Sequence, residues 1–88
     1  MTLSTLRDQI DSIDKEIVAL LSKRLEITKA VARIKKQEGL SILDCERETL
    51  IKEKLKSYAR EKSLNTQMIE EIFEKILEDS RREMGEVV

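Results

Sequence analysis

One arginine, Arg24, lies where the sequence pattern calls for an apolar residue. Apolar residues recur at alternating steps of three and four, which is typical of one stripe of a long helix or coiled coil. They are Leu3, Leu6, Ile10, Ile13, Ile17, Leu20, Ile27, Val31 and Ile34. Arg24 occupies the slot between Leu20 and Ile27. A guanidinium stays charged in a protein, so in an apolar seam it needs an anion beside it. We expect either a carboxylate of the protein or an anionic ligand there.

A second cation, Lys35, follows Arg24 on the same helical face. It lies eleven residues later, which is about 20° away around a helix and roughly 16 Å along its axis. Two long side chains at this spacing could close on one small dianion. Each also has a simpler explanation: Lys35 with Lys36 as a solvated helix end, and Arg24 as a register-setting residue paired with a glutamate.

Polar residues also occupy inward positions in the rest of the chain. Glu48 shares a three-four-three stripe with Ile51, Leu55 and Tyr58, and Arg47 is its neighbour at the start of the expected helix. A surface capping turn would also explain both. Ser80 falls in the stripe of Ile69, Ile72, Phe73, Ile76 and Leu77. The alternative for Ser80 is a hydrogen bond to the carbonyl four residues back.

Arg7 precedes Arg24 by seventeen residues, which places it roughly 25 Å away and on another face of the helix. The two cannot grip one small ligand within one chain. Across an antiparallel partner helix, however, Arg7 of one copy could approach Arg24 of the other. Together these residues predict a pocket between helices, lined by cations, one carboxylate and one hydroxyl.

The composition excludes several kinds of chemistry. There is no histidine and one cysteine, so the chain offers no thiolate–imidazole pair, no hydroxyl–imidazole triad and no usual zinc cluster. We expect no metal and no cofactor, and we interpret Cys45 as a filler rather than a nucleophile. Seventeen basic residues nearly cancel eighteen acidic ones, so we expect no binding to nucleic acid or to an anionic membrane. No segment reads as a membrane span or a signal peptide, and we expect a cytoplasmic protein.

The elements that must position these side chains are helices. The chain has no proline and few aromatic residues, which favours an all-α fold. Gly39 is a natural helix stop, Asp44 a natural N-cap, and Asn65 or Thr66 a cap for the last helix. We predict three helices, over about residues 4–38, 45–61 and 66–85, within a single domain of residues 1–88.

The first predicted helix is very long for a chain of this size. About 35 residues make a rod of roughly 50 Å, whereas a compact 88-residue monomer has a radius of gyration of about 12 Å. Two shorter helices cannot cover so long an apolar stripe. We therefore predict an entwined homodimer in which the rod packs on its own copy across a two-fold axis.

The chain resembles the all-helical chorismate mutase family over almost its whole length. The resemblance rests on the combined spacing of Leu6-Arg7, Ile13-Asp14, Leu20-Leu21, Lys23-Arg24, Lys35, Asp44-Cys45-Glu46-Arg47-Glu48 and Glu78-Asp79-Ser80. It implies a substrate that is a small dicarboxylate, chorismate, and an intramolecular Claisen rearrangement to prephenate on the route to phenylalanine and tyrosine. Such a pericyclic step needs no nucleophile, metal or base. It needs a held dianion, and positive charge where the breaking C–O bond gathers electrons.

The resemblance also implies a role for each site residue. Arg24 and Arg47 would bind the substrate carboxylates, and Arg7 would reach in from the partner subunit. Lys35 would contact the ether oxygen. The implied catalytic residues are Lys35, Arg24, Arg47 and Glu48, and the implied substrate-binding residues add Arg7, Asp44, Ser80 and Met84 to these four.

Met84 is where the chain departs from that family. One turn beyond Ser80 the family usually carries a glutamine or glutamate that gives the ether oxygen a second hydrogen bond, and a thioether donates none. Either Lys35 acts with a weaker partner, or a register shift brings in Glu83 as its protonated acid. The alternative functions are an isochorismate pyruvate-lyase of the same fold and a non-catalytic helical dimerisation module.

Overall fold

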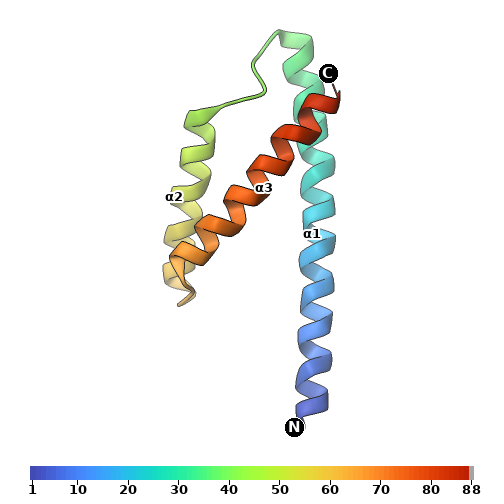
Figure 1. Ribbon diagram of the computed structural model, residues 1–88, viewed down its shortest axis with the longest axis vertical. Coiled ribbons are helices and arrows are strands. Elements are labelled where there is room, and N and C mark those ends of the chain that lie inside the picture. The colour runs from blue at the N-terminus through green and yellow to red at the C-terminus, as the bar shows by residue number, and fades with distance from the viewer. Residues whose placement is uncertain (88) are drawn as a thin grey trace.

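The protein consists of three α-helices. The computed structural model describes the backbone of residues 1–87 and the side chains of residues 1–85, and this part of the chain contains no strand. The helices are α1 (Leu3–Glu38), α2 (Cys45–Glu61) and α3 (Thr66–Val87) (Figure 1). Their starts and the ends of the first two agree with the sequence-based prediction to within about one residue, and α3 runs two residues past Gly85.

The helix boundaries follow from capping residues. Gly39 ends α1 with a φ of 69°, the left-handed conformation that glycine adopts without a steric penalty. The Asp44 carboxylate accepts a hydrogen bond from the Arg47 backbone N–H at 3.0 Å and caps α2. Of the two candidate caps for α3, Asn65 has this role, because its side-chain oxygen accepts from the Met68 N–H at 3.1 Å.

Helix α3 holds the protomer together. It crosses diagonally and packs against both α1 and α2 (Figure 1), whose backbones stay apart from each other in the described residues. The most buried apolar side chains are few: Ala32 on α1, Ala59 on α2, and Leu77 and Met84 on α3. Two of these are alanines, which allow α3 to approach each neighbour closely. The core therefore lies along the two sides of α3.

The predicted inward stripe of α2 is wrong at Tyr58. This ring is 55% exposed, with the Lys62 ammonium 5.5 Å from its centroid, whereas the next residue, Ala59, is 2% exposed. Because α3 crosses α2 obliquely, the line of contact leaves the stripe before Tyr58. Outside that line, ion pairs join Lys52 to Glu74 and Lys56 to Glu70 across the two helices.

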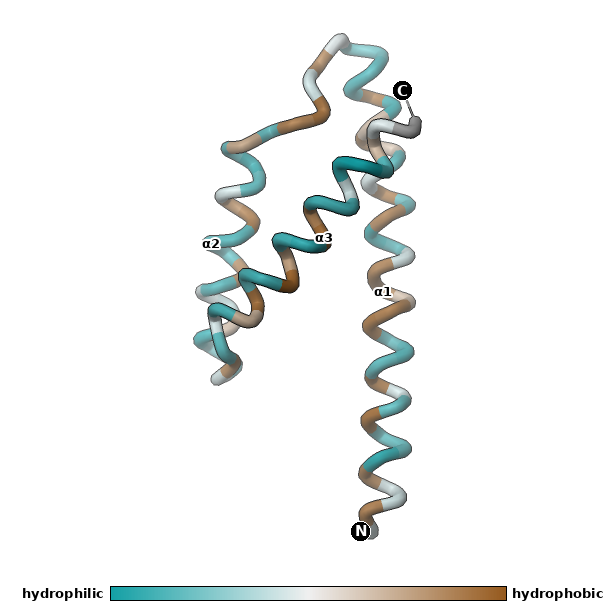
Figure 2. The backbone as a smooth tube through the Cα atoms, viewed as in Figure 1, coloured by the Kyte–Doolittle hydropathy of each residue, from teal (hydrophilic) through white to brown (hydrophobic). Residues whose placement is uncertain are grey.

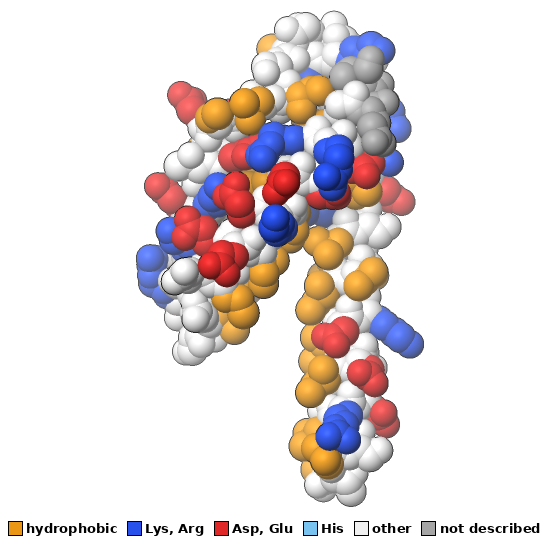
Figure 3. Space-filling view, in the orientation of Figure 1, with side chains coloured by type: hydrophobic (Ala, Val, Ile, Leu, Met, Phe, Trp, Pro, Cys, Tyr) orange, Lys and Arg blue, Asp and Glu red, His pale blue; other side chains and the backbone are white. Residues whose placement is uncertain are grey.

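The N-terminal half of α1 extends alone beyond the other two helices (Figure 1). The protomer measures 55 × 24 × 15 Å, and its radius of gyration of 16.1 Å exceeds the roughly 12 Å of a compact chain of this length. Apolar bands recur along this rod (Figure 2), and they face the open notch between α1 and the α2–α3 pair (Figure 3). In this half of α1, the apolar side chains of the predicted stripe are 41–64% exposed, and they are Leu3, Leu6, Ile10, Ile13, Ile17 and Leu20.

None of the helices in residues 1–87 combines the length and the apolar character needed to cross a membrane.

Candidate functional site

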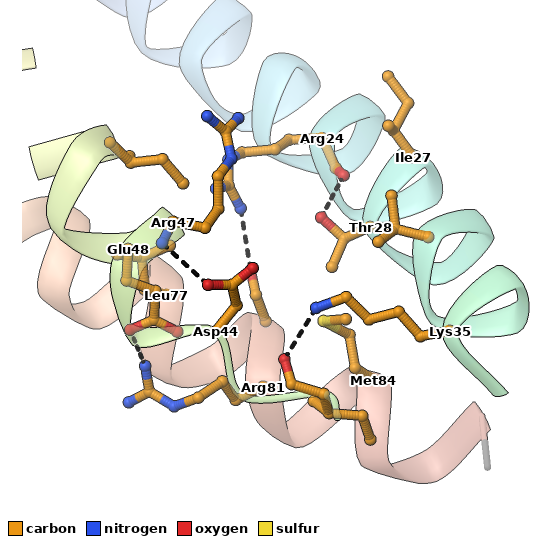
Figure 4. Close-up of a pocket in the computed structure, with 14 residues that line it drawn as sticks. Arg24, Ile27, Thr28, Lys35, Asp44, Arg47, Glu48, Leu77, Arg81 and Met84 are labelled. Atoms are coloured by element: carbon orange, nitrogen blue, oxygen red, sulfur yellow. Dashed lines mark hydrogen bonds and ion pairs between the residues drawn. The ribbon is translucent and has the colours of Figure 1, made fainter. Parts of the chain in front are cut away.

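A cavity lies where the C-terminal half of α1, the start of α2 and the C-terminal half of α3 meet (Figure 4). Its volume of about 310 Å³ is at the lower end of the range of roughly 300–1,000 Å³ for small-molecule sites. The residues that line it are Arg24, Ile27, Thr28, Val31, Lys35, Ile42, Asp44, Arg47, Glu48, Ile51, Leu77, Ser80, Arg81 and Met84.

The structure brings together seven of the eight residues that the sequence singled out. Arg24 and Lys35 come from α1, Asp44, Arg47 and Glu48 from the cap and first turn of α2, and Ser80 and Met84 from α3. The eighth, Arg7, is exposed on the part of α1 that extends beyond the other helices. Within one protomer, Arg7 is not a wall of this cavity.

Arg24 is held in place by a neutral partner. Its Nη1 donates a hydrogen bond to the Ser80 hydroxyl oxygen at 2.9 Å, and Ser80 is 8% exposed. Among the side chains of residues 1–85, no carboxylate lies within 4 Å of the Arg24 guanidinium. The cation is thus oriented by a hydroxyl and not neutralised within the described protomer, which leaves its charge for an anion from elsewhere.

Two further cations, Lys35 and Arg47, line the same cavity (Figure 4). The Lys35 Nζ donates to the backbone carbonyl of Ile42 at 3.2 Å, so Lys35 lies in the pocket and is not a solvated helix end. One contact leaves other N–H groups of the ammonium available for a ligand. Arg47 projects from the first turn of α2, whose start Asp44 fixes through its cap.

Glu48 is paired with Arg81, a residue that the sequence analysis did not single out. The Arg81 Nη1 donates to Glu48 Oε1 between α3 and α2, and the two side chains are 32% and 18% exposed. This hydrogen bond raises the pKa of the Arg81 guanidinium. A signal for Arg81 was available: it stands three residues before Met84, and residues three apart share one helical face.

At the end of α3 the structure places Met84, and not Glu83, against the cavity. Met84 is 6% exposed, and Figure 4 shows its side chain on the same side of the pocket as Lys35. The Glu83 carboxylate instead lies 3.7 Å from Lys29 Nζ, outside the lining residues. The register shift that would bring in Glu83 is therefore wrong, and the pocket has a thioether at this position.

The charge of the cavity suits a dianion. Its lining holds four cations (Arg24, Lys35, Arg47 and Arg81) and two carboxylates (Asp44 and Glu48), which leaves two positive charges. The whole chain has a net charge of −1, so this local excess is not a property of the general surface. In the described residues, no three potential metal-binding side chains cluster together.

Residues 6–84 of this chain match the family model for chorismate mutase type II. The chain belongs to that family. Two similar proteins are a bifunctional chorismate mutase/prephenate dehydratase of Buchnera aphidicola, 38% identical over 78 residues, and a chorismate mutase of Methanocaldococcus jannaschii, 33% identical over 79 residues. The matches cover 89% and 90% of this chain.

The two relatives of this chorismate mutase family member differ in length. The chain spans 20% of the Buchnera protein but 80% of the Methanocaldococcus protein. Among solved structures, a conserved hypothetical protein from Pyrococcus furiosus is 44% identical, with a TM-score of 0.72 over 96% of each chain. The three-helix arrangement is thus shared with an archaeal protein of matching length.

Proposed function

We propose that this protein is a chorismate mutase that converts chorismate to prephenate, a step in the synthesis of phenylalanine and tyrosine. The observation that carries the proposal is the cavity with an excess of two positive charges, whose lining includes seven of the residues that the family resemblance implicates. The relative of similar length from Methanocaldococcus bears the name chorismate mutase, and the Buchnera relative joins this activity to a prephenate dehydratase.

The cavity can lower the entropic part of the activation free energy. Chorismate must fold its enolpyruvyl chain over its ring before the new bond can form, and two held carboxylates restrict it to that geometry. Arg24 and Arg47 approach from different helices, so each can take one carboxylate. The Ser80 hydroxyl fixes the direction of Arg24, which limits the reorganisation needed when the dianion arrives.

The cavity also addresses the charge that develops in the transition state. As the C–O bond breaks, electron density builds on the ether oxygen, and a fixed cation there stabilises the transition state more than the substrate. Lys35 has this role, because it is the cation of the cavity beside Met84, away from the two arginines of α1 and α2 (Figure 4).

The uncovered face of α1 supports the dimer as part of the same proposal. A row of apolar side chains, 41–64% exposed from Leu3 to Leu20, is a large apolar area for a monomer to leave in water. A second copy with the same stripe covers it across a two-fold axis. That copy also brings its Arg7 towards the cavity and adds a third positive charge.

The first prediction concerns the reaction itself. Purified protein incubated with chorismate should consume the chorismate absorbance and produce prephenate, with no added metal or cofactor. The matched control is Arg24→Met, which keeps a long side chain but removes the charge, and it should lower kcat/KM at least about a hundredfold. Pyruvate from isochorismate without prephenate from chorismate would instead show a lyase, and neither product would show a non-catalytic dimerisation module.

The second prediction tests the contribution of the partner's arginine. Arg7→Ala and Arg24→Ala homodimers should each lose activity, because each damages both cavities. Mixing them should restore about a quarter of wild-type activity after random exchange, since half the dimers carry one intact cavity of two. No recovery despite subunit exchange verified by mass spectrometry would place Arg7 outside the partner's cavity.

The third prediction concerns Met84. Replacing it with glutamine adds the missing donor near Lys35, so Met84→Gln should raise kcat by about tenfold while changing KM little. Met84→Leu is the control, since it fills the same space without a donor and should leave kcat within about threefold of wild type. Equal rates in both variants would show that position 84 only packs.

A further inference from the structure

The ion pair between Arg81 and Glu48 forms part of the cavity wall. Both residues line the cavity, and both side chains are less than one-third exposed. The pair joins α3 to the first turn of α2, which is the turn that also presents Arg47. Arg81 therefore pairs with one of the two carboxylates of the lining that could repel an anionic ligand, the other being Asp44.

Two other ion pairs join the same helices, and their polarity is opposite. Lys52 and Lys56 on α2 pair with Glu74 and Glu70 on α3. At the cavity, α2 supplies the acid and α3 the base. If α2 slipped along α3 by one helical turn, Glu48 would take the position of Lys52, opposite Glu74. The carboxylates of Glu48 and Glu74 would then repel each other. The reversed pair thus disfavours the slipped register.

The contact with Arg81 also determines how Glu48 can meet a ligand. A carboxylate has two oxygens that accept hydrogen bonds, and Arg81 engages Oε1 of Glu48. The other oxygen remains available to accept from a hydroxyl of the ligand. Without Arg81, the same carboxylate would keep its full negative charge beside a dianion, and the net charge of the cavity would fall from two to one.

We propose that Arg81 is a positioning residue that neutralises and orients Glu48, so that the cavity binds a hydroxylated dianion without repelling it. This inference rests on the proposed function for the identity of the dianion. Arg81 acts through Glu48, and its importance should disappear when the charge of Glu48 is removed.

The test is a double-mutant series with Arg81→Met and Glu48→Gln, measured as kcat and KM for chorismate and as Kd for prephenate by calorimetry. Arg81→Met alone should raise KM and Kd by about tenfold, because it leaves a like charge within a few ångströms of the ligand. Adding Glu48→Gln should bring KM and Kd back to within about threefold of wild type. The double variant should still have a lower kcat, because the ionised acceptor is gone.

The matched control is Lys52→Met, which removes the neighbouring ion pair of the same two helices outside the cavity. It should affect thermal unfolding about as much as Arg81→Met, but leave KM and Kd within about twofold of wild type. Arg81→Lys keeps the positive charge, so its KM for chorismate and its Kd for prephenate should stay within about threefold of the wild-type values. If Arg81→Met does not fold, Arg81→Gln takes its place in the same series.

The outcomes separate this inference from the proposed function. A wild-type protein that binds prephenate but does not convert chorismate would overturn the function, and the Kd series would still test Arg81. If wild type neither binds nor converts, both fail. If wild type is active but Arg81→Met keeps its KM, or Glu48→Gln fails to restore it, then Arg81 is only a strut between the helices.

Discussion

The structure depends on the charge of Arg24 within an apolar seam. A guanidinium in such a place carries a desolvation cost that only an anion or a set of hydrogen bonds offsets. The protomer provides one hydroxyl, from Ser80, and in residues 1–85 no carboxylate within ion-pairing distance. A hydroxyl orients a cation but does not neutralise it. In the proposed function, a bound dianion neutralises Arg24 and the other cations of the cavity.

The shape of the protomer follows from the same arrangement. Helix α3 crosses between α1 and α2 and carries the Ser80 that fixes Arg24 and the Arg81 that holds Glu48. Because a single crossing helix covers only the C-terminal half of α1, the other half is left with its apolar stripe exposed. The proposed second copy covers that half and brings in Arg7. The proposed dimer would thus account both for the exposed half of α1 and for the position of Arg7 far from the cavity of its own protomer.

The sequence predicted the features that depend on residues close together in the chain, namely the helix ends and the residues that share a helical face. Gly39, Asp44 and Asn65 act through their own backbone neighbours, so the helix boundaries were readable from single residues. The shared face of Arg24 and Lys35 follows from helical periodicity alone. Tyr58 was misplaced because the angle at which α3 crosses α2 is a tertiary property. The helical face that Arg81 shares with Met84 could have been predicted, but its pairing with Glu48 could not, because that partner lies 33 residues away.

The central claim is that Arg24 and Arg47 are two cations that bind one dianion. The most direct measurement is NMR of arginine side-chain N–H groups during titration with prephenate, with assignments from Arg24→Lys and Arg47→Lys. The account predicts that the Nε–H signals of both arginines shift together and saturate at one prephenate per protomer. Saturable binding that leaves both signals unmoved, or moves only arginines outside the cavity, would contradict it.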